Sequence, residues 1–318
     1  MNVEIVIPIL ISFVISVLLC PIFIPFLKKL KFSQFVRENG PETHLKKKGT
    51  PTMGGIIILI SVVITSLLYI KKNQELIPVL FATLGFGFIG LLDDFIKIIK
   101  NRSMGLKPSF KIVGQILVTL IFGYYLLRVM HIGTTTILPF TNGRTLELGK
   151  YFFPIMFVTV LGTVNGANFT DGLDGLASSV TILAAVFFSV AAIGMKSGIS
   201  PITCGVIGSL LGFLIYNVYP ARVFMGDTGS LALGGFVAAS AYLLKMPFFI
   251  LIVGFIYFIE VLSVMLQVSF FKISGGKRIF KMAPIHHHLE LCGWCETKIV
   301  AIFSVITALL CLVGLWAL

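Results

Sequence analysis

Long apolar runs alternate with short polar stretches along the whole chain. Ten of these runs have roughly the 17 to 25 residues that a helix needs to cross the hydrocarbon core of a bilayer. They cover residues 3–27, 53–70, 76–93, 112–128, 153–168, 177–195, 201–217, 230–245, 247–271 and 298–317. The fifth, seventh and eighth runs are short or glycine-rich, so their edges are defined only to within several residues. The pattern predicts an all-α polytopic membrane protein with about ten transmembrane helices.

Composition supports this fold class. Hydrophobic residues make up 57% of the 318 residues and charged residues only 12%, whereas a soluble domain carries roughly 25% charge. No long polar linker interrupts the chain, which predicts a single membrane domain over residues 1–318. The formal net charge of +12 is typical of basic cytoplasmic loops in a membrane protein, so we expect no nucleic-acid partner. The five scattered cysteines suggest no disulfide framework.

The distribution of lysine and arginine predicts the orientation. If the ten runs all cross the membrane, alternate loops face opposite sides, and one set of loops holds 18 of the 25 lysines and arginines. Cytoplasmic loops carry the excess of positive charge. This places the loops around residues 28–48, 97–111 and 272–298 in the cytoplasm and both termini outside.

One external loop has a pattern of its own. Residues 134–148 alternate polar and apolar side chains around Asn142-Gly143, and Asn-Gly favours a tight hairpin turn. We therefore expect a small external β-hairpin there, with a plain loop as the alternative.

All five aspartates fall on the predicted cytoplasmic side, although they come from three separate parts of the chain. They are Asp93, Asp94, Asp171, Asp174 and Asp227. Solvated loops would spread aspartate over both faces, so we interpret this distribution as one shared polar site at the inner face. Asp93 and Asp94 end an apolar run with Lys97 one turn later, and two adjacent carboxylates repel unless a cation lies between them or one is protonated. A divalent metal would satisfy that requirement.

Three glycine-containing stretches could contribute to such a site. Residues 49–55 (Gly-Thr-Pro-Thr-Met-Gly-Gly) precede a helix, where unpaired N–H groups favour anions. Residues 168–175 (Asn-Phe-Thr-Asp-Gly-Leu-Asp-Gly) place two carboxylates three residues apart; helix capping accounts for one of them. Residues 226–230 expose Asp227 before a helix, and carboxylate oxygens of this kind suit Mg²⁺. Phe224 is either a stacking partner for a base or an interfacial anchor.

The last basic loop holds His286, His287 and His288 in sequence. Three consecutive histidines cannot all point one way, which argues against a three-histidine metal site, but imidazoles can bind phosphate or carry protons. Cys292 and Cys295 mimic a redox or zinc pair, but the sequence offers no second pair nearby. Glu260 lies inside run 247–271. An intramembrane acid is a functional candidate, although we favour a structural role at a helix bend.

Taken together, these motifs closely resemble the MraY family, the phospho-N-acetylmuramoyl-pentapeptide transferases, within the polyprenyl-phosphate N-acetylhexosamine-1-phosphate transferase superfamily. The resemblance covers nearly the whole chain. Its five motifs, in order, are Gly49 to Gly55, Asp93-Asp94 with Lys97, Asn168 to Gly175, Asn217 with Phe224 to Ser230, and His286 to His288 with Glu290. The triple histidine and residues 49–55 point to the muramoyl-pentapeptide branch.

The resemblance implies a reaction, partners and residue roles. UDP-N-acetylmuramoyl-pentapeptide would give its phospho-sugar to undecaprenyl phosphate, yielding lipid I and UMP at the cytoplasmic face of the bacterial cell membrane. Mg²⁺ would be the cofactor, and the family also suggests a homodimer. The implied catalytic residues are Asp93, Asp94, Asp227 (the Mg²⁺ ligand) and His286. The implied substrate-binding residues are Lys46, Lys97, Lys111, Asn168, Asp171, Asp174, Asn217, Phe224, His287 and His288.

Two mechanisms and two other functions stay open. The lipid phosphate could attack the β-phosphate directly, with Asp93 or Asp94 as base, or an aspartyl-phosphate intermediate could form first. A related transferase using UDP-N-acetylglucosamine is the alternative within the enzyme class. A transporter with an inward-facing charged vestibule is the alternative outside it. No internal repeat supports the transporter.

Overall fold

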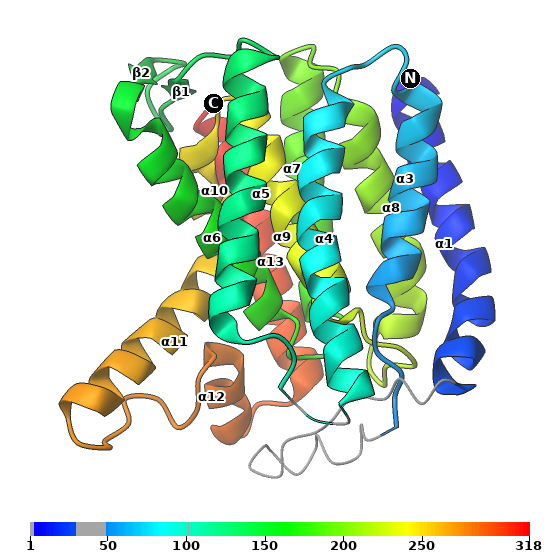
Figure 1. Cartoon of the computed structure of the whole chain (residues 1–318), viewed down its shortest axis with the longest axis vertical. Helices are drawn as coiled ribbons and strands as arrows, with labels where there is room; N and C mark the ends of the chain where they lie inside the picture. Colours follow the sequence, from blue (N-terminus) through cyan, green and yellow to red (C-terminus); the bar gives the residue numbers. More distant parts are fainter. Residues whose placement is uncertain (1–2, 30–48, 101, 103) are drawn as a thin grey trace.

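A computed structural model describes residues 3–29, 49–100, 102 and 104–318. Lys46 therefore lies outside the described residues. Figure 1 shows a bundle of long helices that cross the molecule from end to end. The long helices are α1 Val3–Lys29, α3 Gly55–Tyr69, α4 Leu76–Ile99, α5 Pro108–Arg128, α6 Phe152–Thr170, α7 Leu176–Gly194, α8 Ser200–Asn217, α9 Gly226–Leu243, α11 Phe255–Ile273 and α13 Glu296–Trp316. Shorter helices are η1 Gly149–Tyr151, η2 Pro247–Phe249, α10 Ile250–Val253 and α12 Ile285–Leu291.

Each of the ten predicted runs overlaps one of the long helices over most of that helix. Among the described residues, eight of these helices are long and apolar enough to cross a membrane. The other two are α3, which has only 15 residues, and α9, which has 18 residues rich in glycine and alanine. The structure is thus a mostly helical, multi-pass bundle, as the hydrophobic pattern predicts.

Helix α9 is the centre of the bundle. Every residue from Thr228 to Leu243 is buried, and the helix packs against α4, α6 and α3. Small side chains allow these close approaches, as they do at membrane helix interfaces generally. A Cβ added to Gly90 of α4 would lie 2.0 Å from the carbonyl oxygen of Asp227, and one added to Gly55 of α3 would lie 2.2 Å from the nitrogen of Gly229. The first turn of α9 is therefore clamped between two neighbouring helices.

The predicted hairpin is present. Strand β1 Thr135–Ile137 pairs antiparallel with β2 Thr145–Glu147 in the register Thr136↔Leu146. Asn142 and Gly143 have φ values of 53° and 77°, which are the positive angles that make Asn-Gly favourable in such turns. Ile137 also donates its backbone N–H to the carbonyl oxygen of Lys245, so the hairpin is tied to the segment just after α9.

The predicted run over residues 247–271 does not form a single helix. The chain forms η2 and the four-residue helix α10, and then breaks at Gly254, whose φ and ψ are −100° and 20°. A Cβ at this position would lie 2.8 Å from the carbonyl oxygen of Ile250, so the close packing of this turn requires glycine. After the break, α11 leans away from the bundle (Figure 1). Apolar side chains on its outer face, including Met265 and Ile273, are exposed.

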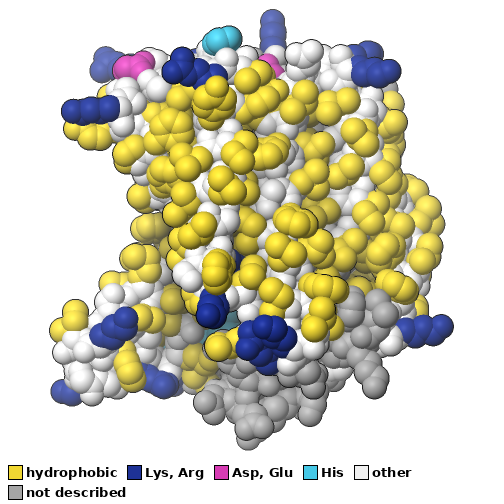
Figure 2. Space-filling view, viewed as in Figure 1, with side chains coloured by type: hydrophobic (Ala, Val, Ile, Leu, Met, Phe, Trp, Pro, Cys, Tyr) yellow, Lys and Arg dark blue, Asp and Glu magenta, His cyan; other side chains and the backbone are white. Residues whose placement is uncertain are grey.

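The surface agrees with a membrane environment. Figure 2 shows a broad hydrophobic band across the face of the bundle in view, with lysine and arginine gathered at its two ends. Exposed apolar side chains such as Leu18 and Ile22 of α1 and Leu312 of α13 face outward. Both chain ends lie at the end of the bundle that carries the hairpin (Figure 1), as the predicted topology requires. Which end faces the cytoplasm stays a prediction.

Candidate active site

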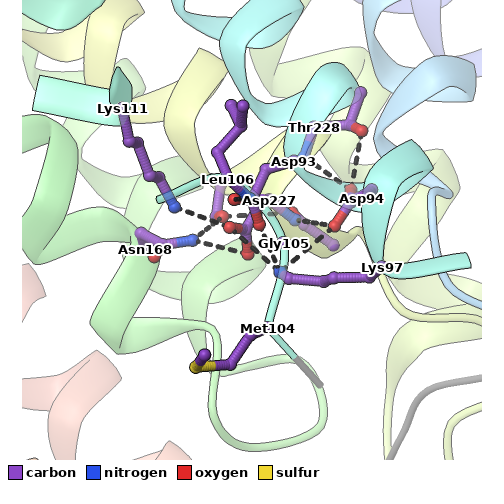
Figure 3. A network of polar contacts seen from close by, with 12 residues as sticks. Asp93, Asp94, Lys97, Met104, Gly105, Leu106, Lys111, Asn168, Asp227 and Thr228 are labelled. Atoms are coloured by element: carbon purple, nitrogen blue, oxygen red, sulfur yellow. Dashed lines mark hydrogen bonds and ion pairs between the residues drawn. The ribbon is translucent and has the colours of Figure 1, made fainter. Parts of the chain in front are cut away.

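Three carboxylates meet where α4 ends and α9 begins, at the end of the bundle opposite the hairpin. Asp93 and Asp94 come from α4 and Asp227 from α9, and each offers an oxygen atom within 4.8 Å of the others (Figure 3). Asp93 and Asp94 are each only 3% exposed. Like charges this close and this buried require positive partners.

Asp94 forms a cap on α9 from a different helix. Its carboxylate accepts hydrogen bonds from the backbone N–H of Asp227 (3.2 Å), the backbone N–H of Thr228 (2.9 Å) and the hydroxyl of Thr228 (2.7 Å). The first N–H groups of a helix lack intrahelical partners and favour a negative charge. Gly226 has φ of 69°, and a Cβ there would lie 2.6 Å from Asp94 Oδ2. Asp94 therefore closes the start of α9 and sets the position of Asp227.

Asp93 is held differently. Its Oδ1 accepts a hydrogen bond from the backbone N–H of Leu106 at 2.9 Å, and its Oδ2 lies 2.6 Å from the ammonium nitrogen of Lys97. Gly105 packs directly against the carboxylate, because a Cβ there would lie 2.6 Å from it. The loop before α5 thus covers one side of Asp93.

Two lysines and one asparagine complete the cluster. Lys97 Nζ lies 3.6 Å from Asp94 Oδ1 and 3.2 Å from Asp227 Oδ2, so it contacts all three acids. Lys111 Nζ of α5 lies 2.6 Å from Asp227 Oδ2. Asn168 of α6 donates to Asp227 Oδ1 at 3.1 Å. Helices α4, α5, α6 and α9 therefore bring six of the predicted site residues together (Figure 3).

The cluster suits a divalent cation. Among the described residues, it is the one group of three or more aspartate, glutamate, histidine or cysteine side chains close enough to share an ion. Its donor set is all oxygen, which magnesium prefers over sulfur or nitrogen. Three carboxylates against two ammonium groups also leave the cluster net negative when all are ionised.

Asp174 and Asn217 lie in a neighbouring polar region. Asp174 Oδ2 accepts from the backbone N–H of Ala221 at 2.8 Å. Asn217 donates to the carbonyl oxygen of Val223 at 3.0 Å and accepts from Ser178 at 2.9 Å. Both residues are at least 97% buried, so in this structure they shape the turn that leads to Phe224.

The structure brings three of the five aspartates together in one cluster. Asp93, Asp94 and Asp227 form the cluster, whereas Asp171 and Asp174 do not belong to it. Asp171 is half-buried at the end of α6, three residues after Asn168. The segment of residues 168–175 therefore links the cluster at one end with the Asp174 region at the other.

The suggestion that residues 49–55 offer unpaired N–H groups to an anion was wrong. Gly54 and Gly55 donate their N–H groups to the carbonyl oxygens of Phe224 (2.8 Å) and Met225 (2.9 Å). Phe224 in turn donates to the carbonyl oxygen of Pro51 at 2.8 Å. The segment instead docks beside residues 224–225 and supports the approach to α9.

The three histidines have three different partners. His286 is fully buried, and its Nδ1 lies 3.0 Å from Glu260 Oε2 of α11. His287 Nδ1 lies 2.7 Å from Glu290 Oε2. His288 Nδ1 accepts from the backbone N–H of Lys281 at 3.1 Å. All five cysteines are free thiols, and Cys292 and Cys295 are exposed.

Sequence reasoning missed several members of these sites. Thr228, Ser230 and the backbone of Leu106 all contact the cluster or its ligands. The hydroxyls directly after Asp227 were the available signal, because serine and threonine in a first helical turn can bond to neighbouring groups. Nothing in the sequence pointed to Leu106, since a backbone N–H carries no residue-specific signal.

The fold and the site together define a class: a multi-pass helical membrane protein whose helices assemble a buried, lysine-compensated carboxylate cluster at one end. The family model described as glycosyl transferase family 4 matches residues 76–245. The phospho-N-acetylmuramoyl-pentapeptide-transferase signature 1 matches residues 47–59.

Curated relatives agree along nearly the whole chain. Phospho-N-acetylmuramoyl-pentapeptide-transferases of Clostridium botulinum (strain Alaska E43 / Type E3) and Acetivibrio thermocellus are each 50% identical over 313 residues, covering 97% of this chain and 95% and 94% of theirs. That of Clostridium kluyveri is 48% identical over 312 residues, covering 98% of both chains. The chain belongs to glycosyl transferase family 4 and, within it, to the phospho-N-acetylmuramoyl-pentapeptide transferases, which confirms the resemblance.

Proposed function

We propose that this protein transfers phospho-N-acetylmuramoyl-pentapeptide from its UDP donor to undecaprenyl phosphate, giving lipid I and UMP. The observation that supports this most directly is the carboxylate cluster, with Lys97 and Lys111, at one end of a membrane bundle. A water-soluble nucleotide and a membrane-bound phosphate meet only at such an interface. The excess of lysine and arginine at this end favours the cytoplasmic face of the bacterial cell membrane.

We propose Mg²⁺ as the cofactor, with Asp227 as a ligand and Asp93 beside it. The fit of the oxygen donors supports this assignment. Both reactants carry negative charge, so phosphoryl transfer depends mainly on alignment and charge neutralisation. Bound magnesium would neutralise the donor diphosphate and polarise its phosphorus.

The chain's own residues then have separate tasks. Lys97 and Lys111 hold positive charge where the phosphates of donor and acceptor would meet. Asp94 is occupied with three hydrogen-bond donors on α9, so its task is to place Asp227. Asp93 accepts a single backbone hydrogen bond and the Lys97 ammonium, which makes it the better placed of the two as a base.

We propose direct displacement as the mechanism. An oxygen of the lipid phosphate attacks the β-phosphorus of the donor, and the bond to the bridging oxygen breaks as UMP leaves. A base is chemically optional, because a phosphate monoester is largely ionised near neutral pH. The alternative is an aspartyl-phosphate intermediate. Isolation of a phospho-sugar covalently attached to purified enzyme in the absence of lipid would rule out direct displacement.

The donor's uracil end would lie toward Asp174 and Phe224. The hydrogen bond from Ala221 ties Asp174 to the turn that precedes Phe224, so the two residues belong to one wall. Asp171 and Asn168 would connect this wall to the cluster. His287 and His288 would face the sugar and phosphate region.

The test is release of UMP by purified protein in detergent with polyprenyl phosphate and Mg²⁺. We expect turnover with UDP-N-acetylmuramoyl-pentapeptide, loss of turnover in EDTA, and loss in the variant Asp227→Asn. Turnover with UDP-N-acetylglucosamine alone would reject the proposed donor. No turnover with either nucleotide would reject a transferase and favour transport.

A further inference from the structure

Glu260 and His286 form a buried pair outside the carboxylate cluster. Both side chains are 0% exposed, and His286 Nδ1 lies 3.0 Å from Glu260 Oε2. Among the described residues, neither Glu260 Oε1 nor His286 Nε2 has a hydrogen-bond partner. Buried polar atoms almost always have partners because an unpaired one is costly. Two unpaired atoms in this one pair indicate that the contact between Glu260 and His286 has a function besides stability.

The unpaired nitrogen of His286 faces a particular residue. A Cβ added to Gly172 would lie 2.2 Å from His286 Nε2 and 2.7 Å from Cε1. The φ of Gly172 is outside the left-handed range, so lack of space, rather than backbone conformation, requires glycine here. The ring of His286 therefore lies directly against the backbone of the segment of residues 168–175.

This contact links α11 to the donor side of the site. Glu260 belongs to α11, His286 to α12, and Gly172 to the segment between α6 and α7. Gly172 has Asp171 as its neighbour and lies two residues from Asp174. An imidazole can rotate about its Cβ–Cγ bond, and the Glu260 carboxylate favours the orientation that places Nδ1 beside it. The opposite ring edge is then held against Gly172.

We propose that Glu260 is a positioning residue for the donor: through His286 it holds the Gly172 segment so that Asp171 and Asp174 are arranged for the nucleotide. This inference rests on the proposed function, because it assigns the segment to UDP-donor binding. It gives the intramembrane acid a role in binding, beyond the structural role at a helix bend that the sequence favoured.

The test measures equilibrium binding of UMP by calorimetry and the KM of the UDP donor. The variant Glu260→Leu removes the carboxylate, and we expect about tenfold weaker UMP binding and a similar rise in donor KM, with kcat changed less than about threefold. The KM of polyprenyl phosphate stays unchanged. Glu260→Gln keeps a hydrogen-bonding group beside Nδ1, so it should restore UMP binding to within about threefold of the parent.

Gly172→Ala tests the contact itself. The added Cβ would collide with His286, so UMP binding should weaken as it does in Glu260→Leu. In a His286→Ala background the collision disappears, and Gly172→Ala should have no further effect, which makes the two substitutions non-additive. The matched control is Gly162→Ala in α6, where a Cβ would meet nothing within 4 Å; it should bind UMP as the parent does.

The outcomes separate this inference from the proposed function. Parental UMP binding by folded Glu260→Leu, or additive effects of Gly172→Ala and His286→Ala, would overturn the inference alone. If Glu260→Leu does not fold, the test uses Glu260→Gln. An unshifted imidazole ¹⁵N resonance of His286 would show that the ring keeps its environment in this variant, and weak UMP binding despite that would overturn the inference. Absence of UMP binding and turnover in the parent protein would instead refute the proposed function, and the donor role of the segment with it.

Discussion

Asp93 and Asp94 are adjacent and chemically identical, yet their oxygens have different partners. Asp94 accepts three hydrogen bonds from the start of α9, while Asp93 contacts Lys97 and the backbone of Leu106. The sequence could predict that both acids belong to a site. It could not divide the tasks between them, because the partner of Asp94 is a helix end more than 130 residues away.

We expect Asp94→Asn and Asp93→Asn to differ in stability. In Asp94→Asn an amide nitrogen replaces one of the two oxygens that accept from the backbone N–H groups of Asp227 and Thr228, so one buried donor loses its acceptor, which costs about 1–3 kcal/mol. Asp93→Asn loses an ion pair but no cap. Both variants should lose turnover, while only Asp94→Asn should show a clear fall in Tm in detergent. Equal Tm values for Asp94→Asn and the parent protein would contradict the capping role.

Lys97 neutralises three carboxylates at once, and its replacement should expose their repulsion. In Lys97→Met only Lys111 compensates the cluster, so we expect a lower Tm in EDTA and a larger rise in Tm on adding Mg²⁺ than in the parent. UMP release should fall by at least about a hundredfold. The matched control is Lys100→Met, an exposed lysine at the end of the same helix. An unchanged Mg²⁺ response in Lys97→Met would show that this lysine does not balance the cluster.

At the scale of the helices, the site depends on how closely α4 and α9 approach. Gly90 lies against the carbonyl oxygen of Asp227, and a Cβ there would be 2.0 Å from it. Backbone atoms cannot move aside as a flexible side chain can, so an added methyl group would push the first turn of α9 away from α4. Asp227 would move away from Asp93 and Asp94 with it.

Gly90→Ala should therefore reduce both stability and activity. Overpacking of this kind costs about 1–3 kcal/mol, which should appear as a lower Tm together with slower UMP release. Gly162→Ala, also within a helix but with open space around it, is the control and should be neutral or slightly stabilising, because alanine favours helix over glycine. A Gly90→Ala variant with parental Tm and activity would mean that the two helices can separate without cost.

The elements show which predictions a single sequence supports. Hydrophobic runs located the long helices, and Asn142-Gly143 located the hairpin, because both signals are local. The break at Gly254 was missed, since a lone glycine in an apolar run does not by itself interrupt a helix. The role of residues 49–55 was misjudged for a different reason: their N–H groups pair with Phe224 and Met225, and the sequence does not say which distant backbone supplies a partner.

For the whole molecule, the distribution of charge leads to a test of orientation. Cys292 and Cys295 are exposed at the end of the bundle that carries α12, whereas Cys20, Cys204 and Cys311 are buried. We expect a membrane-impermeant maleimide to label Cys292 and Cys295 in inverted vesicles but not in intact cells. In a variant with both cysteines replaced by serine, Asn142→Cys in the hairpin should show the opposite pattern. Labelling of Cys292 or Cys295 in intact cells would overturn the predicted topology.

The reactivity of Cys295 should also depend on its neighbour Thr297. A hydrogen bond with Thr297 lowers the pKa of the Cys295 thiol, and the thiolate is the reactive form. A lowered pKa means a larger thiolate fraction at a given pH below the ordinary thiol range. In the Cys292→Ser background, maleimide should therefore react with Cys295 faster than it does when Thr297→Val is added, near neutral pH, and this difference should narrow as the pH rises.

The cap that Asp94 of α4 forms on α9 has a consequence for biogenesis. Helices enter the membrane in order during synthesis, and α5, α6, α7 and α8 separate the carboxylate of Asp94 from the helix end that it closes. A ribosome-bound chain arrested before Thr228 would already contain Asp93, Asp94, Lys97 and Lys111, but it would be catalytically silent. The carboxylate cluster therefore forms only after α9 has been inserted between helices that entered the membrane before it.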